Sequence, residues 1–340
     1  MNFCIYTRNN LTNALILQFL QTLSVKLGIT LPQSGKSATK ENILKVAQSA
    51  ENSGIDSLWV FERLLWPLKP QTPYPASKDG LLLEEYQVIY DPLQTLGFAS
   101  AKTSKIQIGT CILDILFHNP VILAKSLATL DNLSDGRLIA GFGLGWMKDE
   151  FQASNIPFEK RGKRYDELIE LIKKMWLEDI VSFSGVYYNL PPSKVGPKPK
   201  QKPYIPFFLG GFSPQSLSRI MKTDANGWLG AAVGQRDIIK KTIESIKSKA
   251  LEANKNPKKF KIILLSYPQI VKEDLADNMP EHDHQRQLMR GSLDQIGSDI
   301  QYLKSVGVDH LITSLTFGNG SKDIEKTMDM AKQFQEFAKA

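Results

Sequence analysis

Short apolar runs alternate with amphipathic stretches eight times from Val25 onward, and this rhythm limits the fold more than any other feature of the chain. Each run is brief and apolar, as expected of a strand that is buried on both faces. Eight sequential strand–helix units favour a closed (β/α)8 barrel, the TIM barrel of the α/β class, over an open doubly wound sheet. The expected strands are Val25–Thr30, Ser57–Phe61, Lys105–Leu113, Arg137–Phe142, Ile205–Leu209, Gly227–Gly230, Phe260–Val271 and His310–Ser314.

Capping and turn residues lie at the ends of the amphipathic stretches. Ser37 and Thr39 precede the first amphipathic stretch, and Asn52-Ser53-Gly54 follows it. Ser213-Pro214 places a capping hydroxyl before a proline in the first turn of another predicted helix. These are the start and stop signals of helices that connect buried strands.

Three segments are too long for simple connections and predict insertions after strands 2, 4 and 7. They are Leu64–Tyr90, Ile180–Pro206 and Lys272–Gly291, and the second contains a predicted hairpin at Val181–Leu190. The first and third follow strands directly, so we expect them to lie over the catalytic face of a barrel. We expect residues 25–340 to form one domain behind an N-terminal extension, residues 1–24.

Charge and composition narrow the classes of partner. The net charge is +7, but the Lys and Arg residues are spread along predicted helices and mixed with acids, so we expect solvated helix faces and no nucleic-acid patch. A phosphate-bearing cofactor or an acidic substrate suits the positive surplus equally well. No stretch approaches the roughly 20 unbroken apolar residues of a membrane helix, so we expect no stable insertion into a membrane.

Two further features concern the compartment. Cys4 and Cys111 form no motif and no disulfide framework, so a reducing cytoplasm is the default expectation. Leu11–Leu23 resembles the core of a weak signal peptide, but Asn13 and Gln18 interrupt it and no small-residue cleavage site follows. We therefore favour a short packed helix, or an extension that contributes little, over export.

Two glycine-rich turns follow predicted strands. Gly141-Phe142-Gly143-Leu144-Gly145 lacks the spacing of a dinucleotide fingerprint, so it is either a plain strand end or a close backbone approach to a flat ring or phosphate. Gly210-Gly211-Phe212-Ser213-Pro214 lies between a strand and a helix, where exposed N–H groups and the helix dipole make an anion site. A simple capped helix is compatible with that role.

Other motifs carry weaker signals. Ser34-Gly35-Lys36-Ser37 looks like the end of a phosphate-binding P-loop, but the glycine that the pattern requires upstream is absent, which favours an ordinary turn. His282 and His284 form an H-x-H pair with no identifiable third ligand, so we predict no metal site. The role of His118, at a predicted helix start, stays open, and we expect His310 to be structural.

Ordered runs along most of the chain resemble the luciferase-like monooxygenase family, especially its branch that depends on the deazaflavin coenzyme F420. Each run is weak alone, but the set in this order is specific and spans roughly Val25 to Gln335. The matching runs are Ser57–Glu62, Asp91–Leu93, Ile106–Thr110, Asn119–Lys125, Leu127–Leu138, Gly141–Trp146, Glu150–Phe151, Arg161–Arg164, Phe208–Gly211 and Asp224–Leu229.

The resemblance implies a (β/α)8 barrel that holds its cofactor at the C-terminal ends of the strands. By the same match, Cys111 and Ile112 form a non-proline cis peptide behind the central ring of the cofactor. Gly143, Gly145 and Trp146 flank the cofactor, and its phosphate is held by Gly210, Gly211 and Ser213.

The chain departs from the family pattern at the end of the second strand. Many deazaflavin enzymes carry an acidic residue followed by His there, whereas this chain has Glu62-Arg63, and some relatives have a carboxylate where Trp146 stands. Both changes weigh against alcohol oxidation of the sugar-phosphate type. We predict that Glu62 acts as the acid/base or orienting group and that Arg63 binds an anionic substrate.

The resemblance further implies an oxidoreductase that moves hydride between a small organic substrate and a flavin or deazaflavin ring. We expect coenzyme F420, with FMN as the alternative that would permit luciferase-type monooxygenation. A non-catalytic flavin-binding barrel and a phosphate-substrate isomerase or aldolase barrel are the competing hypotheses. We also expect a homodimer.

Overall fold

The computed structural model describes residues 24–75, 77, 79–256, 259–272, 274–275, 278–279, 284–316 and 323–340, without the side chains of residues 278, 279, 284 and 285. The expected extension, residues 1–24, lies outside the described residues except for Ser24. The side chains of the H-x-H pair and part of the predicted third insertion, 272–291, also lie outside them.

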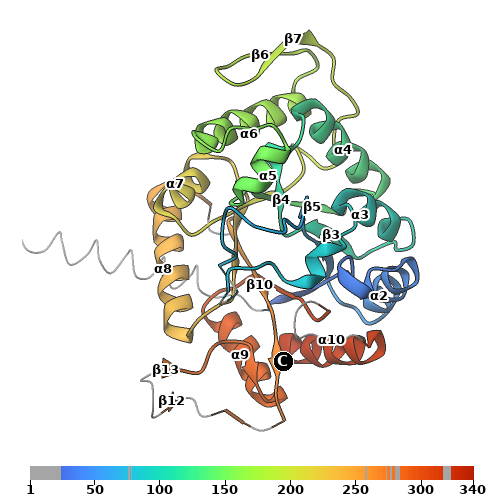
Figure 1. Cartoon of the computed structure of the whole chain (residues 1–340), viewed down its shortest axis with the longest axis vertical. Helices are drawn as coiled ribbons and strands as arrows, with labels where there is room; N and C mark the ends of the chain where they lie inside the picture. Colours follow the sequence, from blue (N-terminus) through green and yellow to red (C-terminus); the bar gives the residue numbers. More distant parts are fainter. Residues whose placement is uncertain are drawn as a thin grey trace, which may run out of the picture.

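Eight parallel strands form a closed barrel (Figure 1). They are β1 (Lys26–Thr30), β2 (Ser57–Val60), β3 (Gln107–Thr110), β5 (Leu138–Gly143), β8 (Phe207–Gly210), β9 (Gly227–Ala231), β10 (Lys261–Ser266) and β15 (His310–Thr313). The hydrogen-bonded order runs β3-β2-β1-β15-β10-β9-β8-β5, and β3 also pairs with β5, which closes the cylinder. This topology confirms the predicted (β/α)8 fold.

Helices surround the barrel in chain order (Figure 1). They are α2 (Lys40–Asn52), α3 (Pro92–Ser100), α4 (Pro120–Leu133), α5 (Lys148–Ala153), α6 (Arg161–Leu177), α7 (Pro214–Lys222), α8 (Arg236–Glu252), α9 (Leu293–Ser305) and α10 (Ile324–Lys339). Thr39 caps α2 by accepting the Asn42 N–H at 3.1 Å. Gly54 follows α2 with φ +72°, a conformation that glycine adopts without steric cost.

Trp59 fills the middle of the barrel. Its side chain is fully buried, and its indole occupies the space that Cβ atoms on Gly28 and Gly109 would enter, at 2.4 and 2.5 Å. Its Nε1 donates to Ser57 Oγ at 2.6 Å, and the buried His310 ring meets it edge-on at 5.5 Å. Packed side chains therefore separate the two ends of the barrel.

Two of the predicted strands are too long. We expect one strand over 105–113, but the structure has β3 and the short β4 (Leu113–Asp114), separated by Cys111 and Ile112. We expect another over 260–271, which divides into β10 and β11 (Gln269–Ile270). Pro268 stands between these two and has no N–H to donate to a ladder.

A carboxylate from a neighbouring helix holds each of the two later long segments in place. The predicted hairpin forms from β6 (Val181–Ser184) and β7 (Asn189–Ser193). Glu167 of α6 accepts the three backbone N–H groups of residues 186–188 at its tip, at 2.7–3.0 Å. The hairpin is therefore held along the outer side of α6.

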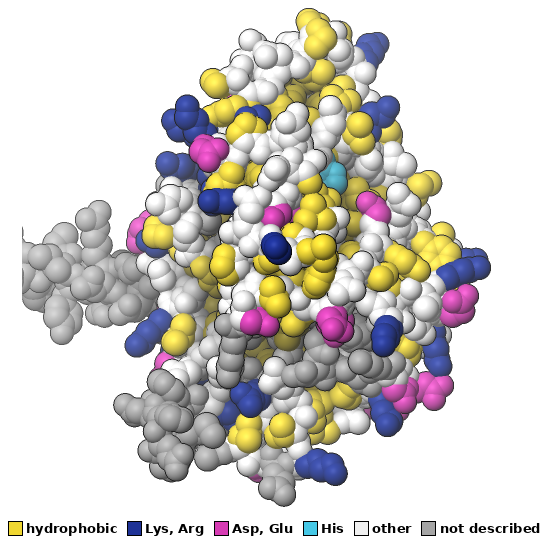
Figure 2. All heavy atoms as spheres, viewed as in Figure 1, with side chains coloured by type: hydrophobic (Ala, Val, Ile, Leu, Met, Phe, Trp, Pro, Cys, Tyr) yellow, Lys and Arg dark blue, Asp and Glu magenta, His cyan; other side chains and the backbone are white. Residues whose placement is uncertain are grey.

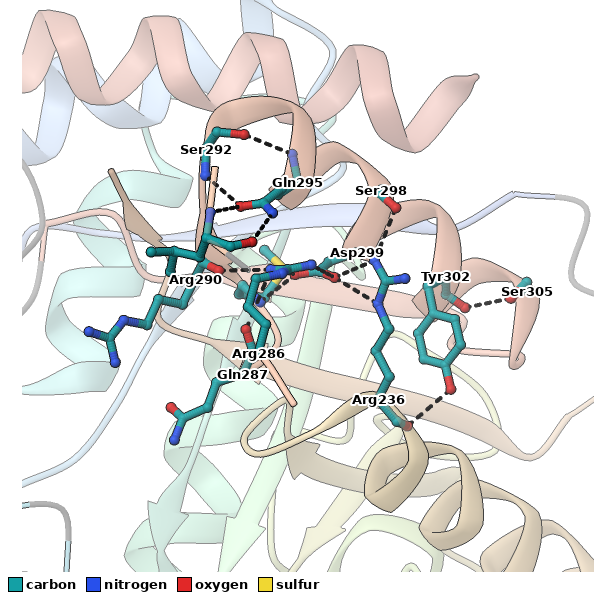
Figure 3. A network of polar contacts seen from close by, with 12 residues as sticks. Arg236, Arg286, Gln287, Arg290, Ser292, Gln295, Ser298, Asp299, Tyr302 and Ser305 are labelled. Atoms are coloured by element: carbon teal, nitrogen blue, oxygen red, sulfur yellow. Dashed lines mark hydrogen bonds and ion pairs between the residues drawn. The ribbon is translucent and has the colours of Figure 1, made fainter. Parts of the chain in front are cut away.

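Asp299 of α9 anchors the segment that follows β10. Its carboxylate is fully buried and accepts hydrogen bonds from Arg236 at 2.6 Å, from Arg286 at 2.8 Å and from the Met289 N–H at 2.8 Å. Figure 3 shows the two guanidinium groups converging on this carboxylate, Arg236 from α8 and Arg286 from the segment before β14 (Arg290–Gly291). A single negative charge thus joins three parts of the chain.

Replacing Asp299 by Asn should lower the free energy of unfolding by about 3–5 kcal/mol, because Arg286 would stay buried without its counter-charge. Asp329→Asn is the matched control, since Asp329 is exposed and pairs with Lys332 at the surface; its effect should stay below about 1 kcal/mol. Urea unfolding followed by circular dichroism measures both variants. Equal unfolding midpoints for the two variants would contradict the anchoring role of Asp299.

Candidate active site

The residues predicted for the site lie at one end of the barrel. Glu62 and Arg63 follow β2, Gly145 and Trp146 follow β5, and Gly211 follows β8. Because all these strands are parallel, their carboxyl ends meet at the same end, where the loops of such barrels form active sites. The closed sheet therefore brings together residues that are far apart in the sequence.

A cis peptide bond joins Cys111 to Ile112, as the resemblance implies. The Ile112 carbonyl oxygen accepts the Glu62 N–H at 3.1 Å, which ties this bond to the end of β2. Ile112 Cδ1 lies 2.0 Å from the place that a Cβ on Gly143 would take and 3.6 Å from that of a Cβ on Gly210. The Ile112 side chain thus lies between the two glycine turns.

Glu62 is a buried carboxylate with two partners. One oxygen, Oε2, accepts the backbone N–H of Asp114 at 2.7 Å, and the other, Oε1, lies 2.7 Å from His118 Nε2. Burial of the His118 ring lowers its pKa, but the hydrogen bond and the charge of Glu62 outweigh burial, so the pKa of His118 is raised above its usual value. The His118 side chain is 23% exposed, so this pair connects solvent to a buried carboxylate.

Asp114 of β4 is a second buried carboxyl group at this end. Its Oδ1 accepts the Gly145 N–H at 3.0 Å, and a Cβ on Gly143 would lie 2.3 Å from the same oxygen. Burial, and next the charge of Glu62, raises the pKa of Asp114 to about 7. This carboxyl group is therefore mostly neutral below pH 7 and negatively charged above it.

The Arg63 guanidinium group is buried in an ion pair. Its Nη1 lies 2.7 Å from Glu150 Oε2, and the guanidinium carbon lies 5.2 and 5.1 Å from the ring centres of Tyr86 and Trp146. Burial raises the pKa of Glu150, against the lowering effect of Arg63. Arg63 Nε is buried without a hydrogen-bond partner in the described part of the chain. A substrate anion at Arg63 would therefore compete with Glu150.

Aromatic rings from the segment after β2 form a wall beside Arg63. Tyr74 and Tyr86 meet edge-on at 5.8 Å with their hydroxyl groups 3.2 Å apart, and Tyr74 lies 5.9 Å from Trp146. Leu68 and Leu81 of the same segment are exposed. In Figure 2, hydrophobic side chains gather near the middle of the face shown, whereas Lys and Arg are scattered among acidic side chains. The site thus has an apolar cover beside its buried charges.

The turn after β8 presents the first turn of α7 to solvent. Gly211 has φ +115°, which favours glycine, and Trp228 Nε1 donates to its carbonyl oxygen at 3.0 Å. Ser213 is exposed and caps α7 by accepting the Ser216 N–H at 3.1 Å. The exposed start of α7 and its helix dipole suit a phosphate group.

Four residues occupy this end that the sequence alone did not assign to it: Asp114, His118, Glu150 and Tyr86. Asp114 directly follows the predicted apolar strand at 105–113, and Glu150 belongs to one of the matching runs. The long segment that contains Tyr86 carries no pattern that predicts which of its side chains turn inward.

Metal and membrane signals are absent from the described residues. No group of three or more His, Cys, Asp and Glu side chains in this part of the chain is arranged to hold a metal ion. None of the helices that the structure describes combines the length and the apolar character needed to cross a bilayer.

Comparisons with known proteins agree with this geometry. Residues 22–333 match the family model described as luciferase-like monooxygenase. The uncharacterized protein Rv0953c of Mycobacterium tuberculosis is 34% identical over 184 residues, which are 54% of this chain and 65% of that protein. The F420-dependent glucose-6-phosphate dehydrogenase of Kineococcus radiotolerans is 29% identical over 212 residues, 61% of this chain and 57% of that enzyme. These matches span less than two thirds of either relative.

Solved structures share the fold at low sequence identity. An F420-dependent secondary alcohol dehydrogenase in complex with an F420-acetone adduct has a TM-score of 0.72 at 19% identity, covering 94% of this chain and 100% of that one. The monooxygenase RslO1 from Streptomyces bottropensis has a TM-score of 0.71 at 21% identity, covering 92% and 98%. With the family model matching nearly the whole chain, this protein belongs to the luciferase-like monooxygenase family, whose members are oxidoreductases.

Proposed function

We propose that this protein is an F420-dependent oxidoreductase that acts on a small organic substrate. The observation that carries the proposal is the position of Ile112, on a cis peptide bond, between Gly143 and Gly210 at the C-terminal end of the barrel. Because neither glycine carries a side chain, each presents only backbone toward Ile112, and this suits the close approach of a flat tricyclic ring.

The phosphate of the cofactor would be held by Gly210, Gly211 and Ser213. Their place before the first turn of α7 offers backbone N–H groups and the positive end of a helix dipole. The exposure of Ser213 leaves room for an anion there. The positive net charge of the chain also favours an anionic cofactor.

The ring would be held by Cys111 and Ile112 from behind and by Gly143, Gly145 and Trp146 at its side. When bound, such a cofactor accepts or donates hydride at its central ring. The protein's own residues position the substrate, exclude water and move protons.

Glu62 and His118 are the groups that we propose to move a proton. His118 is partly exposed and lies 2.7 Å from the buried Glu62 Oε1, so a proton can pass from solvent through Nε2 to that oxygen. Arg63, held by Glu150, would orient an anionic substrate beside this pair. The aromatic wall would exclude water from the same space.

Coenzyme F420 is favoured over FMN by the relatives. Two F420-dependent glucose-6-phosphate dehydrogenases align at 29% and 30% identity. FMN is the alternative because riboflavin lyase (RcaE), solved with modified FMN, shares the fold at a TM-score of 0.70 and 14% identity. A non-catalytic barrel would bind either cofactor without turnover.

Titration of the full-length protein with F420 and with FMN, followed by intrinsic Trp fluorescence, should show tighter binding of F420. Gly210→Ala should weaken that binding at least about tenfold, because the new methyl group would project beside Ile112 into the ring's place. The variant should fold normally, since its Cβ would have no protein atom closer than 3.6 Å. Gly97→Ala, in open space on α3, is the control and should bind like the original protein. F420 binding that Gly210→Ala leaves unchanged would place the cofactor elsewhere.

Asp114 should make stability depend on pH. Its folded pKa of about 7 lies above the roughly 3.9 expected when unfolded, so the folded state holds an extra proton between these values and loses stability as pH rises from about 4 to 7. Relative to Asp114→Asn, which cannot ionise, the original protein should lose about 2–3 kcal/mol between pH 5 and 8. Chemical unfolding at both pH values measures the difference. A difference that is the same at pH 5 and 8, as expected for the exposed control Asp329→Asn, would contradict the raised pKa.

We propose that the expected homodimer forms through α3 and α4. A groove of about 450 Å³ between these helices is lined by Leu93, Ile122 and Leu133. The last two are 64% and 76% exposed, and a second groove of similar volume lies on the other side of α3, beside Phe98. Two adjoining apolar grooves on one face suit a self-complementary contact with a second copy.

Light scattering after size-exclusion chromatography should give a mass near twice the 38.1 kDa of one chain. Leu133→Asp should convert the protein to a monomer, because a carboxylate would be buried against the apolar partner surface. Val186→Asp, at an 84% exposed position on the hairpin, is the control and should stay dimeric. A monomeric original protein, or a dimer that Leu133→Asp leaves intact, would contradict this interface.

A further inference from the structure

A cavity of about 520 Å³ opens at the end of the barrel opposite to the site described above. Its wall is formed where the amino ends of seven strands meet, so it contains none of the residues assigned to the cofactor or to proton transfer. Trp59 and its neighbours pack between this cavity and the C-terminal end. Its volume lies within the range of pockets that hold small organic ligands.

Three large apolar side chains form the inner wall. They are Ile139 of β5, Phe208 of β8 and Ile263 of β10, and they are 7%, 6% and 2% exposed. All three point into the barrel and pack in one cluster with Trp59 and Ile312. A ligand that enters the cavity would therefore meet an apolar surface at its inner end.

The outer rim carries a surplus of positive charge. Lys26, Lys259 and Lys261 line the cavity together with one acidic residue, Asp309. Asp309 Oδ1 lies 2.8 Å from Lys261 Nζ, and its other oxygen accepts the Ile262 N–H at 2.8 Å. Lys26 Nζ donates to the neutral Gln107 side chain at 3.3 Å. Three cations against one carboxylate leave two positive charges for a ligand.

His310 and Asn226 are two further polar residues on the wall. Ser57 Oγ accepts the Trp59 Nε1 hydrogen and lies 2.7 Å from His310 Nε2, so this nitrogen of the imidazole already has a partner inside the barrel. His310 is 4% exposed, and burial lowers its pKa to about 3, so the ring stays neutral. Asn226 Oδ1 accepts the Phe207 N–H at 3.0 Å, which leaves its NH₂ group as a donor.

We propose that this cavity binds a small organic carboxylate with an apolar body. The carboxylate would lie among the lysine rim and the Asn226 side-chain NH₂ group, and the apolar body would cover Ile139, Phe208 and Ile263. An inorganic anion would leave the apolar wall bare, and a neutral apolar molecule would leave the lysines without a counter-charge. The proposal stands apart from the proposed function, because it concerns the opposite end of the barrel.

Isothermal titration of the full-length protein with 2-naphthoate tests this proposal. We expect one equivalent to bind, and 2-naphthalenemethanol, which has the same ring system without the charge, to bind at least about tenfold more weakly. The double variant Lys26→Gln/Lys259→Gln should weaken 2-naphthoate binding by about tenfold or more. Lys249→Gln, at an exposed position of α8, is the charge-matched control and should bind like the original protein.

Competition separates this cavity from the C-terminal end of the barrel. Saturating F420 or FMN should leave the 2-naphthoate affinity unchanged if the acid binds among the lysines. Displacement by either cofactor, equal affinity for the acid and the alcohol, unchanged affinity in the lysine double variant, or no binding to the full-length chain would each overturn the proposal.

Discussion

The pairing of β3 with β5 closes the barrel, and the geometry of the candidate site depends on that closure. It brings the end of β3, with its cis peptide bond, against the glycine turn after β5, and the next strand contributes the turn before α7. Ile112 lies between Gly143 and Gly210 for this reason, although the three residues are widely separated in the sequence. If the sheet were open between β3 and β5, Ile112 would contact neither Gly143 nor Gly210. The proposed positions of the ring and of the phosphate would then not lie together at the C-terminal end of the barrel.

Buried acidic and basic side chains lie close together at this end of the barrel. Three buried carboxyl groups, on Glu62, Asp114 and Glu150, lie near two basic groups, on His118 and Arg63. Glu62 and Glu150 each have a direct basic partner, whereas the Asp114 side chain accepts a backbone N–H, and this difference is consistent with its pKa near neutrality. The site thus contains the Glu62 carboxylate, linked to solvent through the His118 imidazole, and the Arg63 guanidinium group, which is already paired with Glu150.

The sequence predicted the barrel because each strand is a buried apolar run with a local signal at either end. It also predicted the cis peptide and the glycine turns, which are local patterns shared with a family. It did not predict the contact of Glu62 with His118 or of Arg63 with Glu150, which join residues 56 and 87 positions apart and depend on how neighbouring strands are aligned. The sequence also did not predict that the strand expected at 105–113 divides in two, because an apolar run does not show where the hydrogen bonds between strands end.

Hydrogen–deuterium exchange with and without F420 tests most directly whether the cofactor binds where the strand ends converge. Bound F420 should slow exchange in three separate segments, the residues around Ile112, the turn after β5 and the first turn of α7, while the outer faces of α8 and α10 stay unchanged. Protection confined to other parts of the barrel, or no change in any of the three segments at saturating F420, would contradict this prediction.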